Sequence, residues 1–130
     1  MKILGLGTDI VNLARIKKIQ LKYGQKFVNK VLTKNEIKIE KKKFQTVRSE
    51  TLAKRFAAKE AISKAIGFGM SKGIYFKNIE IINNKHGKPC VNLYGKTKAI
   101  LKKISKKYDI FLTLSDDKPW SVATALITSK

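Results

Sequence analysis

The sequence has few residues that can form a disulfide or bind zinc. Cys90 is the one cysteine of the chain, and His86 is its one histidine. A single cysteine excludes an intramolecular disulfide and is typical of a protein in the reducing cytoplasm. Structural zinc sites take clustered cysteine and histidine ligands, so the absence of such a cluster argues against a zinc site.

Long apolar runs are also absent. No stretch approaches the roughly 18 consecutive apolar residues that a transmembrane helix needs, so we expect no membrane partner. A predicted strand begins at Lys2 or Ile3, which leaves no room for a signal or transit peptide. The length and composition therefore predict a globular cytoplasmic protein with a single domain over residues 1–130.

Acidic residues are scarce. The chain has 9 aspartates and glutamates against 29 lysines and arginines, which gives a formal net charge of +20. Such a charge favours polyanionic partners: nucleic acid, an anionic membrane surface, phosphorylated ligands or an acidic protein. Many of the lysines are expected on solvated surfaces, so the charge alone does not choose among these partners.

The longest predicted helix covers residues 52–67, with the sequence LAKRFAAKEAISKAIG. Its alanine, leucine, lysine, arginine and glutamate residues are good helix formers. Gly67 is the first glycine or proline in this stretch and fits the position that ends a helix. Ser49 and Glu50 lie immediately upstream and are expected to cap the first turn.

Glu60 is an unusual residue for its position on this helix. At about 100° per residue it falls between Ala53 and Phe56, on the arc that is expected to face the core. A carboxylate there is costly to bury unless a cation or a metal compensates its charge. Lys64 follows one turn later on the same side, so an ordinary ion pair between residues i and i+4 is one interpretation. A bound metal ion is the other.

The N-terminal segment, residues 2–11, is predicted to be a strand that is buried on at least one face. Side-chain alternation places Gly5, Gly7 and Asp9 on the same face. Glycine in a strand usually marks a close approach by another backbone or by a ligand, and here two glycines lead to a carboxylate. Asp9 is therefore either a ligand-binding residue or the cap of the following helix, for which Asn12 is the rival.

The rest of the chain alternates between short helices and strands. Helices are predicted at 12–23, 27–32, 34–43 and 95–108, and strands at 74–83, 89–94, 110–115 and 120–128. Thr33 and Glu36 match the capping-box pattern T-x-x-E at the start of the third helix. Residues 84–88 and 116–119 are predicted turns. The stretch 67–73 contains three glycines, and its exposed backbone amides either cradle a phosphate or only connect two elements.

Five features stand in an order that resembles the holo-acyl-carrier-protein synthases, the short bacterial type of 4′-phosphopantetheinyl transferase. They are GLGTDIV at the start, Arg15, RFAAKEAISKA in the middle, GKP at residues 87–89 and TLSDDKPWSVATALI near the end. The resemblance covers nearly the whole chain. Its most specific part is the G-x-D pattern followed, about fifty residues later, by F-x-x-K-E-A-x-x-K-A.

This resemblance implies both a fold and a reaction. The fold is α+β, with a small, mainly antiparallel sheet packed on a long central helix. The reaction moves the 4′-phosphopantetheine arm of coenzyme A to a serine of apo acyl carrier protein and releases adenosine 3′,5′-bisphosphate. The family's short members are homotrimers with active sites between neighbouring subunits, and the same is implied here.

The resemblance also assigns roles near the reacting atoms. Asp9 and Glu60 are the implied ligands of Mg²⁺, a hard cation that prefers oxygen donors. Glu60 and Lys64 are the implied catalytic residues, and Lys64 contacts a phosphate oxygen and stabilises developing charge. The serine proton goes to Glu60, to a metal-bound water or elsewhere, and the residues leave this open.

Further positions match the family's binding sites for its two substrates. Besides Lys64, the implied coenzyme A site contains Arg55, Gly67, Gly69, Gly87, Lys88 and Pro89. Arg15 matches a first-helix position that contacts acyl carrier protein, and Lys18 and Lys22 lie on the same helix. Because the family's carrier protein is acidic, the basic excess is expected to steer it and the polyanionic cofactor to the site.

One position departs from the family's pattern. Many members have a histidine after the serine of the penultimate strand, where this chain has Asp116. Asp116 is either a third carboxylate near the metal or a residue that shapes the turn together with Asp117.

A basic nucleic-acid-binding module is the alternative function. It predicts basic residues interleaved with exposed aromatic side chains on one face. Most phenylalanines of this chain, including Phe56 and Phe111, fall within apolar runs instead. The alternative also gives Asp9 and Glu60 no role, so we expect no nucleic-acid partner.

Overall fold

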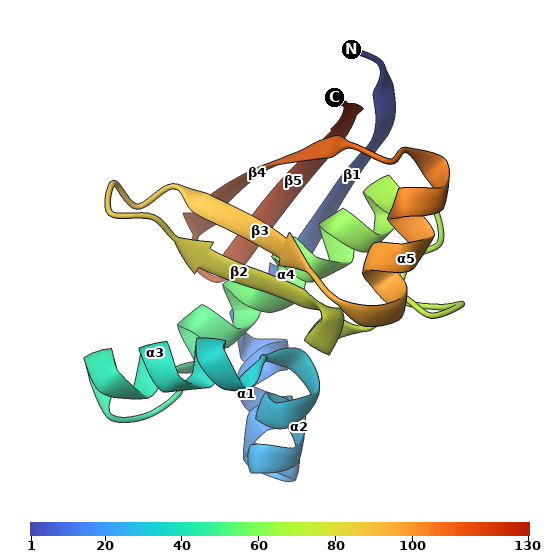
Figure 1. Cartoon of the computed structure of the whole chain (residues 1–130). Helices are drawn as coiled ribbons and strands as arrows, with labels where there is room; N and C mark the ends of the chain where they lie inside the picture. Colours follow the sequence, from blue (N-terminus) through green and yellow to red (C-terminus); the bar gives the residue numbers. More distant parts are fainter.

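The structure of the protein, a computed structural model, describes residues 1–130 and has the α+β fold expected from the sequence. Its elements in order are β1 (Ile3–Asn12), α1 (Leu13–Tyr23), α2 (Gln25–Val31), α3 (Lys34–Phe44), α4 (Ser49–Ile66), the 3₁₀ turn η1 (Phe76–Asn78), β2 (Ile79–Asn83), β3 (Pro89–Leu93), α5 (Gly95–Ile104), β4 (Tyr108–Asp117) and β5 (Trp120–Ser129). The two termini lie side by side (Figure 1), where Ser129 donates a backbone hydrogen bond to Lys2. No helix is both long enough and apolar enough to cross a lipid bilayer.

The strands form two antiparallel sheets instead of the one small sheet expected. Strands β1, β5 and β4 make the first, with β5 in the centre, and β2 and β3 make a separate hairpin. Helix α4 runs between them (Figure 1). Alanines and other small or aliphatic side chains on the inner face of β5, such as Ala123, Ala125 and Ile127, are fully buried. Helix α4 is therefore the element around which the buried core is built.

Helix α4 packs closely against one face of β1. A side-chain carbon added to Gly5 would lie 1.7 Å from the Ala65 carbonyl oxygen, and one added to Gly7 would lie 2.0 Å from that of Ala61. No side chain fits at such distances without moving the helix backbone away from the strand. The prediction that these glycines mark a close backbone approach is confirmed. The approach also brings Asp9, further along β1, beside α4.

Two of the predicted helix starts are confirmed by their caps. The side chain of Asn12 accepts a hydrogen bond from the backbone N–H of Ala14 at 2.8 Å, so Asn12 caps α1 and Asp9 does not. Thr33 and Glu36 form the complete capping box at the start of α3. Asp9 therefore stays within β1, and its carboxylate is free for another role.

The start of α4 differs from the prediction. Ser49 and Glu50 lie in its first turn, and Arg48 takes the N-cap position without a capping hydrogen bond from its side chain. Ser49 donates its hydroxyl hydrogen to the side-chain oxygen of Gln20 on α1 at 2.5 Å, so the prediction that it caps α4 was wrong. Glu50 behaves as expected in the first turn, since a backbone hydrogen bond lowers the pKa of its carboxyl.

Three other boundaries were predicted wrongly. The strand predicted at 74–83 begins only at Ile79, because residues 76–78 form η1. The helix predicted to continue to residue 108 ends at Ile104, and β4 begins at Tyr108 because this residue pairs with Ser129 of β5. Strand β4 also runs through the predicted turn as far as Asp117. Pairing with β5 therefore places Asp116 in a strand.

The outer face of the three-stranded sheet is not covered by any other part of the chain. The register places three rows across it: Leu6, Leu126 and Phe111; Thr8, Thr124 and Thr113; and Ile10, Val122 and Ser115. Leu6 is 67% exposed and Ile10 is 55% exposed. We call these nine residues the outer sheet face. Its rows are apolar or short and hydroxylated, without a charged side chain.

Candidate functional site

Asp9 and Glu60 lie near each other where β1 passes α4. Partial burial is the larger cause that raises the pKa of the Glu60 carboxyl, and the charge of Asp9 raises it further. The charges of Lys64 and Arg15 lower the same pKa. The structure therefore brings four charged side chains from β1, α1 and α4 together, and we call Asp9, Arg15, Glu60 and Lys64 the carboxylate site.

Lys64 pairs with the aspartate of this site. Its ammonium nitrogen lies 3.1 Å from Asp9 Oδ1 and 3.0 Å from the carbonyl oxygen of Thr8. No ion pair joins Lys64 to Glu60, because Lys64 pairs with Asp9 instead. The interpretation of Glu60 and Lys64 as an ordinary i, i+4 ion pair was therefore wrong. About half of the Lys64 side chain remains exposed, and a third ammonium hydrogen is available to an incoming anion.

Two carboxylates without a third protein ligand fit Mg²⁺. The structure has no group of three or more histidine, cysteine, aspartate or glutamate side chains that could hold a metal ion. Mg²⁺ binds through one or two carboxylates and takes its other ligands from water and substrate phosphates. Zinc and calcium sites need more protein ligands, which Asp9 and Glu60 alone do not supply.

Asp116 is not part of the carboxylate site. Its carboxylate pairs with Lys54 at 2.9 Å and faces a different cavity. It also lies within β4, opposite Ser121, and not in the turn. Asp116 therefore does not shape the turn, because the pairing of β4 with β5 places it in a strand, and within one copy of the chain its carboxylate does not join Asp9 and Glu60.

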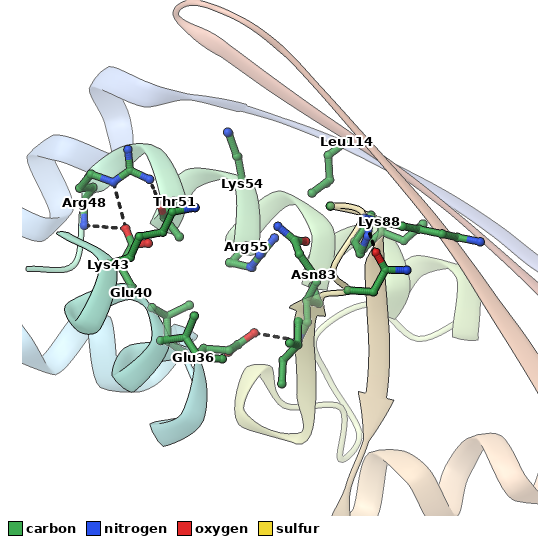
Figure 2. Close-up of a pocket in the computed structure, with 18 of the residues that line it drawn as sticks. Glu36, Glu40, Lys43, Arg48, Thr51, Lys54, Arg55, Asn83, Lys88 and Leu114 are labelled. Carbon is green, nitrogen blue, oxygen red and sulfur yellow. Dashed lines mark hydrogen bonds and ion pairs between the residues drawn. The ribbon is translucent and has the colours of Figure 1, made fainter.

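A groove of about 910 Å³ lies between α3, the first half of α4 and the β2–β3 hairpin. We call it the cationic groove. Its basic side chains are Lys43, Arg48, Lys54, Arg55, Lys85 and Lys88, and its acidic ones are Glu36, Glu40 and Asp116. Figure 2 shows the α3 and α4 side chains on one side and the hairpin residues on the other.

Four of the predicted coenzyme A residues line this groove. Arg55 comes from α4, whereas Gly87, Lys88 and Pro89 come from the hairpin turn. Asn84 shapes that turn, because its side-chain oxygen accepts a hydrogen bond from the backbone N–H of Lys88 at 3.0 Å. The fold therefore brings these four residues, which are distant in the sequence, together at one cavity.

Four cations of the groove form no ion pair, and Arg55 is the one among them that α4 contributes. Arg48 pairs with Glu40 at 3.2 Å, and Lys54 pairs with Asp116. The guanidinium of Arg55 forms no ion pair and points toward the cavity (Figure 2). Partial burial lowers the pKa of Arg55, but arginine stays protonated in proteins, so a full positive charge faces the groove.

The remaining predicted coenzyme A residues lie elsewhere. Lys64 belongs to the carboxylate site, and Gly67 and Gly69 follow it at the end of α4. Gly67 is the C-cap, and both glycines have positive φ angles, 114° and 62°. None of the three lines the cationic groove.

The carboxylate site and the cationic groove lie on different sides of α4. Arg55 and Glu60 are five residues apart, which corresponds to about 140° around a helix. Neither Asp9 nor Lys64 lines the groove. One copy of the chain therefore presents the two groups of predicted residues in different directions.

The basic residues predicted on α1 are exposed. The Arg15 guanidinium, which belongs to the carboxylate site, lies 5.9 Å from the centre of the Phe56 ring. Lys18 and Lys22 are also exposed, and between them Leu21 is 90% exposed. The α1 surface thus combines positive charges with one prominent apolar side chain.

Sequence reasoning missed Lys59. Its side chain is completely buried, and its ammonium donates to Glu36 Oε1 at 2.6 Å, to the Val31 carbonyl at 2.6 Å and to the Phe76 carbonyl at 3.1 Å. The signal was present: Lys59 lies seven residues after Leu52, hence on the same apolar stripe of α4.

Known proteins are similar to this chain in both sequence and fold. A model of the 4′-phosphopantetheinyl transferase superfamily matches residues 5–125. A holo-acyl-carrier-protein synthase of Wolbachia pipientis is 53% identical over 126 residues, which cover 96% of this chain and 97% of the relative. The solved holo-acyl-carrier-protein synthase of Neisseria meningitidis is 36% identical, with a TM-score of 0.83 over 98% of this chain and 99% of that one.

A third similar protein was solved with a ligand. It is the holo-acyl-carrier-protein synthase of Bacillus anthracis in complex with coenzyme A (3′,5′-ADP), 33% identical, with a TM-score of 0.80 over 100% of both chains. The family match spans most of the sequence, and the identities extend over nearly the whole length of each relative. The chain therefore belongs to the 4′-phosphopantetheinyl transferase superfamily.

Proposed function

We propose that this chain transfers the 4′-phosphopantetheine group of coenzyme A to a serine of apo acyl carrier protein and releases adenosine 3′,5′-bisphosphate. The single observation that carries the proposal is the carboxylate site, in which Asp9 and Glu60 meet beside Lys64 on a fold shared with a relative solved with coenzyme A. Membership of this family favours the transferase over a basic nucleic-acid-binding module.

The reaction requires stabilisation of negative charge on phosphate oxygens. The serine hydroxyl attacks the phosphorus of the pantetheine side and gives up its proton. The bond from this phosphorus to the bridging oxygen of the pyrophosphate breaks, and adenosine 3′,5′-bisphosphate leaves with that oxygen. Asp9 and Glu60 would hold Mg²⁺, which supplies positive charge for the phosphate oxygens when bound. Lys64, held at Asp9, donates to a phosphate oxygen and stabilises charge that grows during transfer.

The cationic groove is proposed to bind the nucleotide end of coenzyme A. Arg55 offers an unpaired guanidinium, whose fork of donors matches a phosphate group. Lys88 adds a second positive charge from the hairpin turn, where Gly87 and Pro89 let the backbone approach the ligand. We further propose that the exposed loop glycines Gly67 and Gly69 approach phosphates next to Lys64.

A homotrimer would bring these two parts together. In one copy they point in different directions from α4, so a complete site needs the carboxylate site of one copy and the groove of another. The outer sheet face supports such an assembly, because its apolar side chains, Leu6 and Phe111 among them, are exposed in the single chain. We propose that this face forms the contact between copies.

Leu6→Glu is expected to convert the assembly into folded monomers without transferase activity. The substitution places a charge on the outer sheet face, where burial against another copy would be costly. Light scattering coupled to size-exclusion chromatography measures the mass, and circular dichroism verifies the fold. Leu21→Glu, on exposed α1, is the matched control for assembly and should leave the mass unchanged. A wild-type protein that is monomeric and fully active would contradict the shared site.

Acyl carrier protein is proposed to dock on α1. Arg15, Lys18 and Lys22 offer positive charge to an acidic partner, and Leu21 offers an apolar contact. Arg15 is also part of the carboxylate site, and its charge lowers the pKa of Glu60. A carrier bound to α1 would therefore hold its serine near the reacting phosphate.

Arg15→Ala is expected to raise the KM for acyl carrier protein by roughly tenfold, with a smaller effect on the KM for coenzyme A. Arginine can bind a carboxylate through two parallel hydrogen bonds, which lysine cannot reproduce, so Lys18→Ala serves as the control with a smaller loss. Added salt should weaken the same step, because exposed charges are screened beyond about 8 Å at physiological ionic strength. Steady-state kinetics with each substrate varied in turn measure the two KM values. Equal increases of KM for both substrates would contradict docking of the carrier protein on α1.

Release of adenosine 3′,5′-bisphosphate tests the proposed reaction. Chromatography should detect this product only when coenzyme A, apo acyl carrier protein and Mg²⁺ are all present. Removal of divalent cations with a chelator should stop the release, and added Mg²⁺ should restore it. Salt-sensitive binding to random DNA without any turnover would instead revive the nucleic-acid-binding alternative.

A further inference from the structure

The carboxylate of Glu36 lies between two cations of α4. Lys59 and Arg55 are four residues apart and therefore project from the same side of the helix. Glu36 forms a 2.6 Å ion pair with Lys59 in a fully buried position. It forms no ion pair with Arg55, although its charge is close enough to raise the pKa of that guanidinium.

The two oxygens of Glu36 are already occupied. Oε1 accepts hydrogen bonds from the Lys59 ammonium and from the backbone N–H of Thr33 at 2.8 Å. Oε2 accepts one from the backbone N–H of Ile81 at 2.9 Å. Three donors from α4, the start of α3 and β2 thus fix the carboxylate at the wall of the groove, and Arg55 is left without an acidic partner.

Removal of Lys59 would change this balance. A buried carboxylate without a compensating cation is costly, so Glu36 would turn to another positive charge nearby. Arg55 is such a charge, because Glu36 already acts on its pKa, and an arginine–carboxylate pair with two parallel hydrogen bonds is a strong one. Its donors would then be used within the chain and be lost to an anion in the groove.

We propose that Lys59 is a positioning residue that holds the Glu36 carboxylate away from Arg55 and so keeps the Arg55 guanidinium free to bind a phosphate of coenzyme A. This inference rests on the proposed function, since it takes the groove as the coenzyme A site. It gives the buried lysine next to Glu60 a role in substrate affinity and not in the chemical step.

Two substitutions break the same ion pair and separate this role from simple stabilisation. Lys59→Met frees Glu36 to capture Arg55, so coenzyme A should bind roughly tenfold more weakly or worse. Glu36→Gln removes the competing carboxylate, so coenzyme A should bind at least as tightly as to the wild type. The double variant should bind more tightly than Lys59→Met alone, because no carboxylate remains at position 36 to hold Arg55.

Isothermal titration calorimetry with coenzyme A, without carrier protein, measures these affinities, and thermal unfolding reports stability separately. A purely structural role for the pair predicts that both single variants lose affinity together and that the double variant recovers nothing. Unchanged affinity in Lys59→Met would also overturn the proposal. If Lys59→Met does not fold, Lys59→Gln, whose amide can still donate to the Val31 carbonyl, takes its place with the same expectations.

The Arg55→Gln background distinguishes this proposal from the proposed function. With Arg55 absent, adding Lys59→Met should cause no further loss of coenzyme A affinity, because the two changes act through the same guanidinium. Independent, additive losses would contradict the positioning role. Failure of the wild type to bind coenzyme A at all would refute the proposed function itself.

Discussion

Glu60→Gln is expected to lower the rate of transfer by about 10³-fold or more, which is the upper end of the loss seen when one electrostatic group is removed. The same substitution is expected to make the metal-free protein more stable. Burial and the charge of Asp9 raise the pKa of Glu60 in the folded chain. Folding therefore favours the protonated form, and the ionised carboxylate destabilises the fold at any pH above its folded pKa. An uncharged glutamine removes that destabilisation at neutral pH.

Thermal unfolding with and without Mg²⁺ measures the stability part of this prediction. Mg²⁺ should raise the midpoint of the wild type, because a ligand of the folded state stabilises it, and should have little effect on Glu60→Gln. Glu50→Gln is the matched control on the same helix. A backbone hydrogen bond lowers the pKa of Glu50, so its ionised form favours folding above its unfolded pKa, and its neutralisation should lower the midpoint. If the unfolding midpoints of Glu60→Gln and Glu50→Gln shifted in the same direction, the opposite pKa shifts of these two carboxylates would be contradicted.

Asp9→Asn should share the loss of transfer. Asp9 is the second proposed ligand of Mg²⁺ and also the partner that holds Lys64 at 3.1 Å. Near-normal activity in either the Asp9 or the Glu60 variant, with unchanged dependence on Mg²⁺, would show that these carboxylates do not hold the metal.

Lys64→Ala is expected to lower kcat by roughly 10²–10³, the usual loss when one donor to a transition-state charge is removed. The KM for carrier protein should change little, because Lys64 lies on α4 and not on the proposed docking helix. Lys103→Ala, an exposed lysine of α5, is the matched control and should retain the wild-type rate. Single-turnover kinetics isolate the chemical step.

An unchanged rate in Lys64→Ala would leave this lysine as a surface partner of Asp9 only. Lys64→Arg adds a further comparison, since it keeps the charge but moves the donors. Partial activity in this variant would indicate that positive charge at the site matters more than the position of a single ammonium.

The carboxylate site was predictable because regular elements place side chains by simple geometry. Strand alternation puts Asp9 on the same face as two glycines, and the period of a helix puts Glu60 on the core-facing arc. The face of β1 that carries Asp9 and the arc of α4 that carries Glu60 each have a charged residue where an apolar one is expected. The proposal that these carboxylates hold Mg²⁺ came from the resemblance to the family, because geometry alone does not specify a metal.

The groove and its surroundings depend on contacts between distant parts of the chain. Glu36 accepts a hydrogen bond from Ile81, 45 residues away, and no local pattern predicts that contact. The same holds for Asp116, whose pairing with Lys54 joins β4 to α4. Lys59 was missed although it lies on the apolar stripe of α4, because its compensating carboxylate comes from another helix.

The outer sheet face shows a third limit of the sequence. Alternation separates Leu6 and Ile10 from Gly5 and Gly7, but it does not tell which of the two faces packs within the chain. The answer comes from α4, whose carbonyl oxygens need the space above the glycines. The more apolar side of β1 is therefore the exposed one.

The mass of intact acyl carrier protein tests the central claim most directly. Apo carrier protein incubated with this protein, coenzyme A and Mg²⁺ should gain the mass of one phosphopantetheine group. A carrier whose acceptor serine is replaced by alanine should gain nothing, and Glu60→Gln enzyme should leave the wild-type carrier in its apo form. An unmodified wild-type carrier after incubation with folded wild-type enzyme would contradict the claim.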